Sequence, residues 1–308
     1  MSAALPPAFD DRDGFIWQNG TLVPWRDAKV HVLNHGLHYA SSVFEGARVY
    51  NGQAFKLTEH SQRLHDSAQM LGFTVPYSVA ELDNACREVI KANNITNGYL
   101  RPIAWRGSEQ MAICTTRSSV HVAVTTWEMP PYFGKDALEK GLNLTFAKWK
   151  RPSPETEPVH AKAAGLYMIC TLSKNQATEA GFDDAIMLDW RGFLAEATGA
   201  NLFLVIDGEL HTPTPDCFLN GLTRQAVISL AQKRGINVVE RHMEPSELGR
   251  AQEAFLTGSA AEITPIGSIK GEYGDFNFTV GDITRNMMTD YHQLALDYSE
   301  IAAKNSTP

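Results

Sequence analysis

Residues 196–224 read EATGANLFLVIDGELHTPTPDCFLNGLTR. The run NLFLVI is rich in β-forming residues, and it leads into Asp207-Gly208, a pair that favours a two-residue hairpin turn before the second run, ELHTP. The last residues, LNGLTR, open a helical pattern over residues 223–234 that stops at Gly235. The stretch therefore predicts a β-hairpin followed by a helix, with Glu196 where an earlier strand, FLAE, breaks off.

Both ends of this stretch can carry chemistry. The carboxylate of Glu196 suits an ordinary turn residue bonded to a backbone amide, and it equally suits a partner for a ring nitrogen. At the helix start, the amides of Leu222 and Thr223 meet the positive end of the helix dipole, which favours an anion. A second loop, TGSAAE (257–262), offers Ser259 and further amides after a strand. Helix starts are common, so neither loop alone identifies a ligand.

Lysine and arginine residues elsewhere leave two interpretations open. Residues 160–167 read HAKAAGLY, which places Lys162 among small and apolar residues. Its stem can run along apolar surface while the ammonium stays in water, or burial can lower the amine pKa and make it a nucleophile toward carbonyls. Arg63 is either a solvated helix residue or a bidentate phosphate ligand. Arg101 is either one half of a buried ion pair or a carboxylate ligand.

Composition excludes several classes of protein. The chain has 308 residues, 44% hydrophobic and 20% charged, which is typical of a folded protein of about two domains. A net charge of −8 without a basic cluster argues against a nucleic-acid partner. The N-terminus has no apolar signal segment and no apolar run reaches membrane-spanning length, so we expect neither export nor a membrane partner. Four cysteines without a C-x-x-C pair favour the cytoplasm.

The usual site motifs are absent. The sequence contains no G-x-G-x-x-G, P-loop, H-E-x-x-H or G-x-S-x-G pattern, and His60 and His65 are not at metal-ligand spacing, so we expect no metal.

Strand and helix patterns are grouped along the chain, which favours an α+β fold with two domains. Asn19-Gly20 and Asn51-Gly52 predict hairpins, and helices are expected at 58–71 and after a capping box at Ser78…Glu81. Strands follow at 98–105 and 119–127, and further helices at 161–180 and 281–298. Prolines and Gly134 predict an interdomain loop at 132–141, between a small domain (1–131) and a larger one (142–308).

Taken together, these segments resemble the fold-type IV pyridoxal phosphate enzymes, most closely the branched-chain amino acid aminotransferases. The likeness extends through HGLHYASSVFEGARVY, KLTEHSQRLHDS, YLRP, HAKAAGLY and FLTGSAAEITP. The 29 positions from Glu196 match the class IV signature at Glu196, Thr198, Asn201, Leu202, Phe203, Leu210, Thr212, Leu219, Gly221, Leu222 and Arg224.

The resemblance implies a small N-terminal and a larger C-terminal α/β domain with pyridoxal 5′-phosphate between them. Lys162 would bind the cofactor covalently and then move the proton, Glu196 would hold the pyridine nitrogen, and Tyr167 would touch the ring hydroxyl. The phosphate would be bound by Arg63, Leu222, Thr223 and Ser259.

The resemblance also implies a substrate pocket for Leu, Ile and Val side chains, formed by Tyr39, Phe44, Gly46, Tyr99, Trp127 and Tyr132. Arg101 would pair with the distal carboxylate of glutamate. The α-carboxylate would be held by Tyr99, Ser259 and Ala260.

These residues predict a transaminase that interconverts branched-chain L-amino acids and 2-oxo acids with 2-oxoglutarate and glutamate, as a homodimer. Alternatives are a transaminase for D-amino acids or (R)-amines, 4-amino-4-deoxychorismate lyase, and a non-enzymatic interaction protein. Two departures from the family pattern bear on specificity. The run WRGSEQMAI stands where relatives are glycine-rich, and Asn220 stands where proline is common.

Overall fold

The computed structural model describes residues 8–130 and 132–305, which form two compact units. The first contains residues 8–130, 163–165 and 299–305. The second contains the chain from 132 to Lys162 and Leu166–Tyr298. Each unit combines a sheet with helices, so the predicted α+β class is confirmed.

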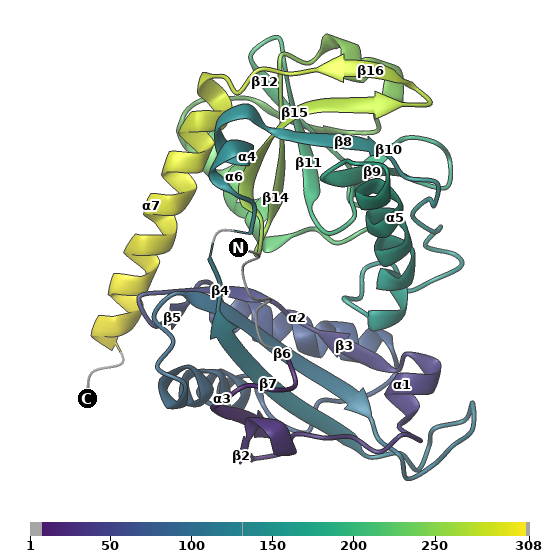
Figure 1. The fold of residues 1–308 in the computed structure, drawn as a ribbon, viewed down its shortest axis with the longest axis vertical. Helices are drawn as coiled ribbons and strands as arrows, with labels where there is room; N and C mark the ends of the chain where they lie inside the picture. The colour runs from purple at the N-terminus through teal and green to yellow at the C-terminus, as the bar shows by residue number, and fades with distance from the viewer. Residues whose placement is uncertain (1–7, 131, 306–308) are drawn as a thin grey trace, which may run out of the picture. The chain divides into compact units, whose positions relative to one another are not determined.

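The first unit is built on a seven-stranded sheet in the order β2-β1-β7-β6-β4-β5, with β3 also paired to β6. β6 and β7 are the long central pair, antiparallel from Gly98↔Glu128 to Arg106↔Val120. Figure 1 shows these strands side by side in the first unit. The strands are β1 (Phe15–Gln18), β2 (Thr21–Pro24), β3 (Ser42–Phe44), β4 (Ala47–Tyr50), β5 (Gln53–Ala54), β6 (Gly98–Arg106) and β7 (Val120–Glu128).

Both predicted Asn-Gly hairpins are present. Gln18 pairs with Thr21 across Asn19-Gly20, and Tyr50 pairs with Gln53 across Asn51-Gly52. All four turn residues have positive φ, from 50° to 100°. Two consecutive left-handed residues give the primed turn that matches strand twist, which explains why Asn-Gly predicts it so well.

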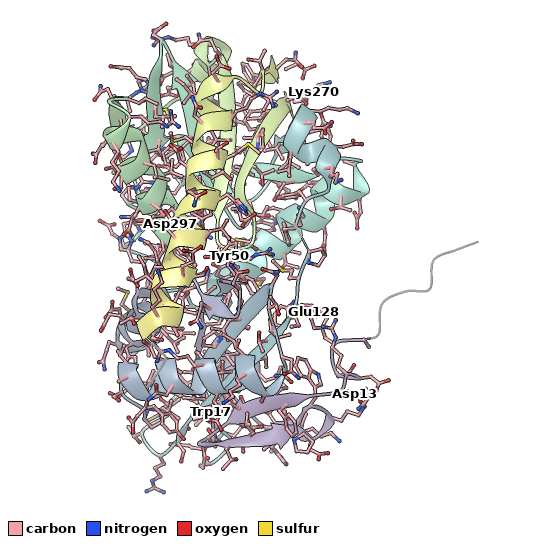
Figure 2. All side chains as sticks on the ribbon, turned by 90° about the vertical axis from the view of Figure 1, so that its left-hand side faces the viewer. Asp13, Trp17, Tyr50, Glu128, Lys270 and Asp297 are labelled. Carbon is pink, nitrogen blue, oxygen red and sulfur yellow. The ribbon has the colours of Figure 1, made fainter. Side chains whose placement is uncertain are left out.

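Three helices accompany this sheet: α1 (His35–Tyr39), α2 (Leu57–Met70) and α3 (Val79–Ala92). The predicted capping box of α3 is confirmed, since Ser78 Oγ accepts from the Glu81 amide and the Glu81 carboxylate accepts from the Ser78 amide. Both long helices bury one face, with Leu64 and Ala68 on α2 and Leu82 on α3 fully buried. The side chains of this unit, Trp17 and Tyr50 among them, are drawn in Figure 2.

The second unit contains a nine-stranded sheet in the order β10-β9-β8-β15-β14-β11-β12-β13, with β16 paired to β15. Because β10 also pairs with β11, the strands β10, β9, β8, β15, β14 and β11 close into a barrel. The strands are β8 (Leu142–Phe146), β9 (Asp184–Leu188), β10 (Leu194–Ala197), β11 (Asn201–Ile206), β12 (Glu209–Pro213), β13 (Val238–Arg241), β14 (Glu253–Gly258), β15 (Glu262–Gly271) and β16 (Gly274–Asn277).

The core of the second unit is formed by inward side chains of these strands, and its fully buried members include Leu144, Ile186, Leu202, Leu204 and Leu256. The predicted turn on Asp207-Gly208 is present, with Ile206 paired to Glu209. The helices of this part are α4 (Lys135–Lys140), α5 (Met168–Glu179), α6 (Leu222–Lys233) and the 3₁₀ turn η3 (Pro245–Arg250). The helix α7 (Asp282–Asn305) and the 3₁₀ turn η2 (Ala164–Tyr167) have residues in both units, and a further 3₁₀ turn, η1 (Trp25–Asp27), belongs to the first unit.

Two predictions about helices need correction. The helix expected at 161–180 begins only at Met168, because Ala163 is held in an antiparallel bridge to Val43 and a 3₁₀ turn follows it. The stretch predicted as an interdomain loop, 132–141, contains α4, which begins directly after Gly134 and ends at Gly141 with φ of 80°. Residue 131, the predicted end of the small domain, lies outside the described residues.

The final helix is longer than predicted, since α7 continues to Asn305. Asp297, labelled on it in Figure 2, is exposed and accepts from Gln293 one turn earlier. Among the helices of residues 8–130 and 132–305, none combines the length and apolar character that crossing a lipid bilayer requires.

Candidate active site

Lys162 and Tyr167 lie together in the second unit. The Lys162 Nζ donates a hydrogen bond to Tyr167 Oη at 2.7 Å. The 3₁₀ turn η2 returns the chain over five residues, so that the phenol faces the amine that precedes it. Both side chains are partly buried. The structure therefore places Lys162, predicted to bind the cofactor covalently, next to Tyr167, predicted to contact the hydroxyl group of the cofactor ring.

Glu196 lies at the point where the barrel closes. Its Cα partner across β10 and β11 is Asn201, whose Nδ2 donates to Glu196 Oε2 at 3.1 Å. The Glu196 side chain is only 12% exposed. Burial raises its pKa to about 7, although the positive charges of Arg151 and Lys162 act in the opposite direction. A carboxyl group held this way is well suited to share a proton with a ring nitrogen.

Arg151 is a site residue that the sequence analysis missed. Its Nε lies 3.4 Å from Glu196 Oε1, and its side chain is 5% exposed. Its Nη1 donates to the Leu166 carbonyl and to Cys170 Sγ, both at 3.4 Å. In sequence Arg151 ends the basic run KWKR, which resembles a solvated surface. Its burial depends on a long-range bridge to Asp189, which no local pattern shows.

The predicted anion seat corresponds to the start of α6. The N-cap residue Gly221 supplies no side-chain cap, so the amides of the first turn, including Leu222 and Thr223, retain their capacity to bind an anion. Asn201 Oδ1 accepts from the Gly221 amide at 3.2 Å. A Cβ at residue 221 would lie 2.3 Å from that oxygen, so this approach requires glycine. The seat and Glu196 are therefore held by one side chain, Asn201.

The loop that carries Ser259 and Ala260 lies at the same end of the barrel. Thr257 pairs with Asn201, and the turn begins directly after Gly258. A Cβ at residue 258 would lie 3.4 Å from the carbonyl oxygen of Gly199, in the turn between β10 and β11. Strand register brings the Ser259 loop close to Glu196, and the hydrogen bond from the Gly221 amide to Asn201 adds the start of α6.

The chemistry of these residues fits pyridoxal 5′-phosphate. The primary amine of Lys162 suits the aldehyde of that group, and the phenol beside it suits the ring hydroxyl. The buried carboxyl group of Glu196 suits the ring nitrogen, and the start of α6, which lacks a side-chain cap, suits the phosphate.

The predicted substrate residues of the first unit form one cluster around Tyr99. The Arg101 guanidinium lies 4.8 Å from the Phe44 ring centroid and 5.3 Å from that of Tyr99. Trp127 lies with its ring 5.3 Å from the Tyr99 ring. A Cβ at Gly46 would lie 1.7 Å from Tyr99 Oη, so the tyrosine occupies the space that glycine leaves. Phe44, Gly46, Tyr99, Arg101 and Trp127 are thus brought together.

Arg101 is not half of a buried ion pair. Within the part of the chain that the structure describes, its one side-chain hydrogen bond is from Nη2 to Tyr99 Oη at 3.4 Å, and its buried Nε has no acceptor. A buried donor without an acceptor is costly unless a ligand satisfies it.

Two predicted pocket residues have their recorded ring contacts with other residues. Tyr39 is 47% exposed on α1, with its ring 4.6 Å from that of His35. Tyr132 is 55% exposed, packs on Phe133 and belongs to the second unit, as do Ser259 and Ala260.

Arg63 is not a solvated helix residue. Its guanidinium makes a bidentate pair with Glu45, from Nε to Oε1 at 2.6 Å and from Nη2 to Oε2 at 2.8 Å. Glu45 is a second residue that the sequence analysis missed, although it stands between two predicted pocket residues.

One group outside these clusters has metal-ligand atoms close together. Ligand atoms of Asp189, Asp216 and Cys217 lie within 4.8 Å of one another. Arg191 Nη2 already bridges the two carboxylates at 2.6 and 2.7 Å, so their charge is compensated from within the chain.

Comparisons with known proteins agree with these observations. The family model described as amino-transferase class IV matches residues 42–269. The branched-chain-amino-acid aminotransferase of Escherichia coli (strain K12) is 43% identical over 263 residues, which are 83% of this chain and 85% of that protein. The solved branched-chain aminotransferase of Thermoproteus uzoniensis with norvaline superposes with a TM-score of 0.88 at 35% identity, covering 94% of this chain and 97% of that one. The branched-chain amino acid aminotransferase of Thermobaculum terrenum, solved in its PLP form, gives a TM-score of 0.83 at 28% identity, covering 93% and 94%.

Proposed function

The chain belongs to the class IV aminotransferases, and from this premise we propose that it moves the amino group of leucine, isoleucine and valine to 2-oxoglutarate. The products are the branched-chain 2-oxo acids and L-glutamate. The protein is an enzyme that uses pyridoxal 5′-phosphate. The observation that carries the proposal is the Lys162–Tyr167 contact at 2.7 Å, beside the buried carboxyl group of Glu196.

Lys162 moves the proton in this proposal. The bound cofactor supplies an electron-poor ring that stabilises negative charge on the substrate Cα. Lys162 Nζ would take the proton from that carbon and deliver it to C4′ of the cofactor, which requires the amine to be neutral when it acts. Tyr167 orients the amine through its hydroxyl group.

Glu196 and Arg151 act as a pair at the far end of the ring. Glu196 holds the ring nitrogen in its protonated form, so that the ring withdraws electrons. Arg151, 3.4 Å away, favours the ionised form of this carboxyl group and so opposes the effect of burial. The phosphate is bound by Arg63, by the first amides of α6 and by Ser259.

The cluster around Tyr99 gives the substrate preference. Phe44 and Trp127 offer apolar surface for a branched side chain, and the missing Cβ of Gly46 admits the Tyr99 ring. The same pocket accepts glutamate because the Arg101 donors can pair with its distal carboxylate. Tyr39, Tyr132 and Ala260 complete the contacts with substrate, and Tyr99, Ser259 and Ala260 hold its α-carboxylate.

The enzyme acts as a homo-oligomer built from dimers. The first unit exposes apolar side chains on two segments, which we propose form one apolar patch: Val30, Val32, Leu33, Leu37 and Tyr39 on the first, and Met111 and Ile113 on the second. Its two halves are joined, since the His35 amide donates to the Gly107 carbonyl and the His35 ring bonds the Ala112 carbonyl, both at 2.9 Å. A large apolar patch of this kind is typical of a protein interface. We place the enzyme in the cytoplasm, where its four free thiols would remain reduced.

Single-substrate spectra test the proposal. Purified protein with its cofactor should be yellow, and the colour should bleach when L-leucine is added without any oxo acid. The Lys162→Ala protein should retain its fold and fail to bleach, because no amine moves the proton. Bleaching by D-alanine or an (R)-amine in place of L-leucine would favour a transaminase of shifted specificity. No response to any amine donor would favour 4-amino-4-deoxychorismate lyase.

A further inference from the structure

Glu45 uses both carboxylate oxygens on side chains of α2. Arg63 contacts both oxygens, at 2.6 and 2.8 Å, and His60 Nδ1 lies 2.6 Å from Oε2. Glu45 is 0% exposed and His60 2%, whereas the Arg63 side chain is 18% exposed. The carboxylate is therefore anchored in the interior, and Arg63 extends from it toward the surface.

Glu45 lies in the two-residue link between β3 and β4. Its neighbours Phe44 and Gly46 both contact the Tyr99 and Arg101 cluster, whereas the Glu45 carboxylate contacts α2. On α2, positions 60 and 63 are one turn apart and share a face. One carboxylate thereby connects the β3–β4 link of the substrate pocket with the arginine proposed to bind phosphate.

The positive partners of residue 45 explain why an acidic side chain is stable at this buried position. Burial opposes ionisation of Glu45, but the charges of Arg63 and His60 outweigh it and hold the pKa of this carboxyl group well below its usual range. A fully buried carboxylate persists only when it is paired and hydrogen-bonded. The bidentate contact also removes rotational freedom from a long side chain before any ligand arrives.

We propose that Glu45 is the positioning residue of Arg63: it fixes the guanidinium by one edge, so that the arginine meets the phosphate of the cofactor in a single orientation. This inference rests on the phosphate role of Arg63 in the proposed function. Glu45 itself touches neither cofactor nor substrate in this role.

The test compares two ligands that differ only in the phosphate. The full-length protein, freed of cofactor, is titrated with pyridoxal 5′-phosphate and with pyridoxal, and the ratio of the two affinities is measured. In Glu45→Gln the ratio should fall on the order of 10-fold or more, the size expected when a charge-assisted contact loses its alignment. Pyridoxal affinity should stay the same. In an Arg63→Met background, Glu45→Gln should change the ratio no further.

Asp83→Asn is the matched control. Asp83 is a second buried carboxylate that holds α2, and it does so through Thr58 and Ser61, at 2.6 Å each, rather than through Arg63. The control should leave the ratio unchanged, which separates positioning from general loosening of the helix. If Glu45→Gln is too unstable to purify, Glu45→Asp replaces it, and a shorter carboxylate should lower the ratio by a smaller factor.

The outcomes are distinguishable. An unchanged ratio in both Glu45 variants, with a reduced ratio in Arg63→Met, overturns the positioning role and leaves the proposed function intact. An unchanged ratio in Arg63→Met overturns the phosphate role of Arg63 together with this inference. A wild-type protein that binds neither ligand overturns the proposed function itself.

Discussion

At the scale of single residues, Glu196 has a carboxyl group in an environment that disfavours its charge. Burial in β10, where its pairing with β11 closes the barrel, raises its pKa from the ordinary 4.5 to about 7. When the folded-state pKa lies above the unfolded one, the protonated form gains most from folding. The resulting stability is fully present below about pH 4.5 and is lost as pH rises through 7.

Replacing the Glu196 carboxyl group with an amide should remove this dependence of stability on pH. With cofactor removed, Glu196→Gln and wild type should unfold at similar temperatures near pH 5, where wild type is largely protonated. At pH 8 the variant should be the more stable, because wild type then buries a charge. Thermal unfolding followed by circular dichroism at both pH values measures this. A constant difference between the proteins would show that Glu196 does not titrate in this range.

Arg101 permits a prediction about specificity. Its buried Nε has no acceptor in the described part of the chain, so a substrate carboxylate gains more from it than an apolar side chain does. Arg101→Met should therefore weaken glutamate about 10-fold or more relative to leucine. Half-reactions with each amino acid alone give the two values. Equal losses for both would reject the distal-carboxylate role.

At the scale of elements, the start of α6 depends on a side chain that departs from the family pattern. Asn220 Oδ1 accepts from Nη1 of the buried Arg224 at 2.9 Å. The same guanidinium also bonds the Pro213 carbonyl and Glu240, so it connects α6 with β12 and β13. A proline at residue 220 would have no side-chain acceptor to offer, and asparagine supplies one.

Asn220→Ala should destabilise the fold by about 1–3 kcal/mol, because a buried donor loses its acceptor. The matched control is Asn84→Ala. Asn84 likewise accepts a hydrogen bond from an arginine, Arg87 at 3.1 Å, but both of these residues are exposed. That change should stay within about 0.5 kcal/mol. Urea unfolding of the two variants gives the comparison, and equal effects would contradict the role assigned to burial.

Local signals explain which elements the sequence predicts. The Asn-Gly and Asp-Gly hairpins and the Ser78 capping box depend on a few adjacent residues, and all are present. The late start of α5 depends on the bridge of Ala163 to Val43, a residue far away in the sequence, and the local pattern could not contain it. Arg151 and Glu45 were missed for the same reason, because their burial and partners come from distant segments.

At the scale of the whole molecule, the apolar patch of the first unit should control assembly. Leu37, one of its residues, is 66% exposed, and Ile301, 60% exposed on α7, provides a control outside the patch. Leu37→Asp should shift the protein from dimer to monomer, because a charge buried in an interface lacks a partner. Ile301→Asp should leave assembly unchanged. Sedimentation velocity reports the masses, and a Leu37→Asp protein of wild-type mass would place the interface elsewhere.

Gly46 and Tyr99 also constrain the routes by which this pocket can diversify. The Tyr99 Oη atom occupies the space that a Cβ at residue 46 would need, because the two positions are only 1.7 Å apart. A lineage, or a directed-evolution library, that enlarges residue 46 also has to move or shorten the side chain of residue 99, so changes at the two positions are coupled.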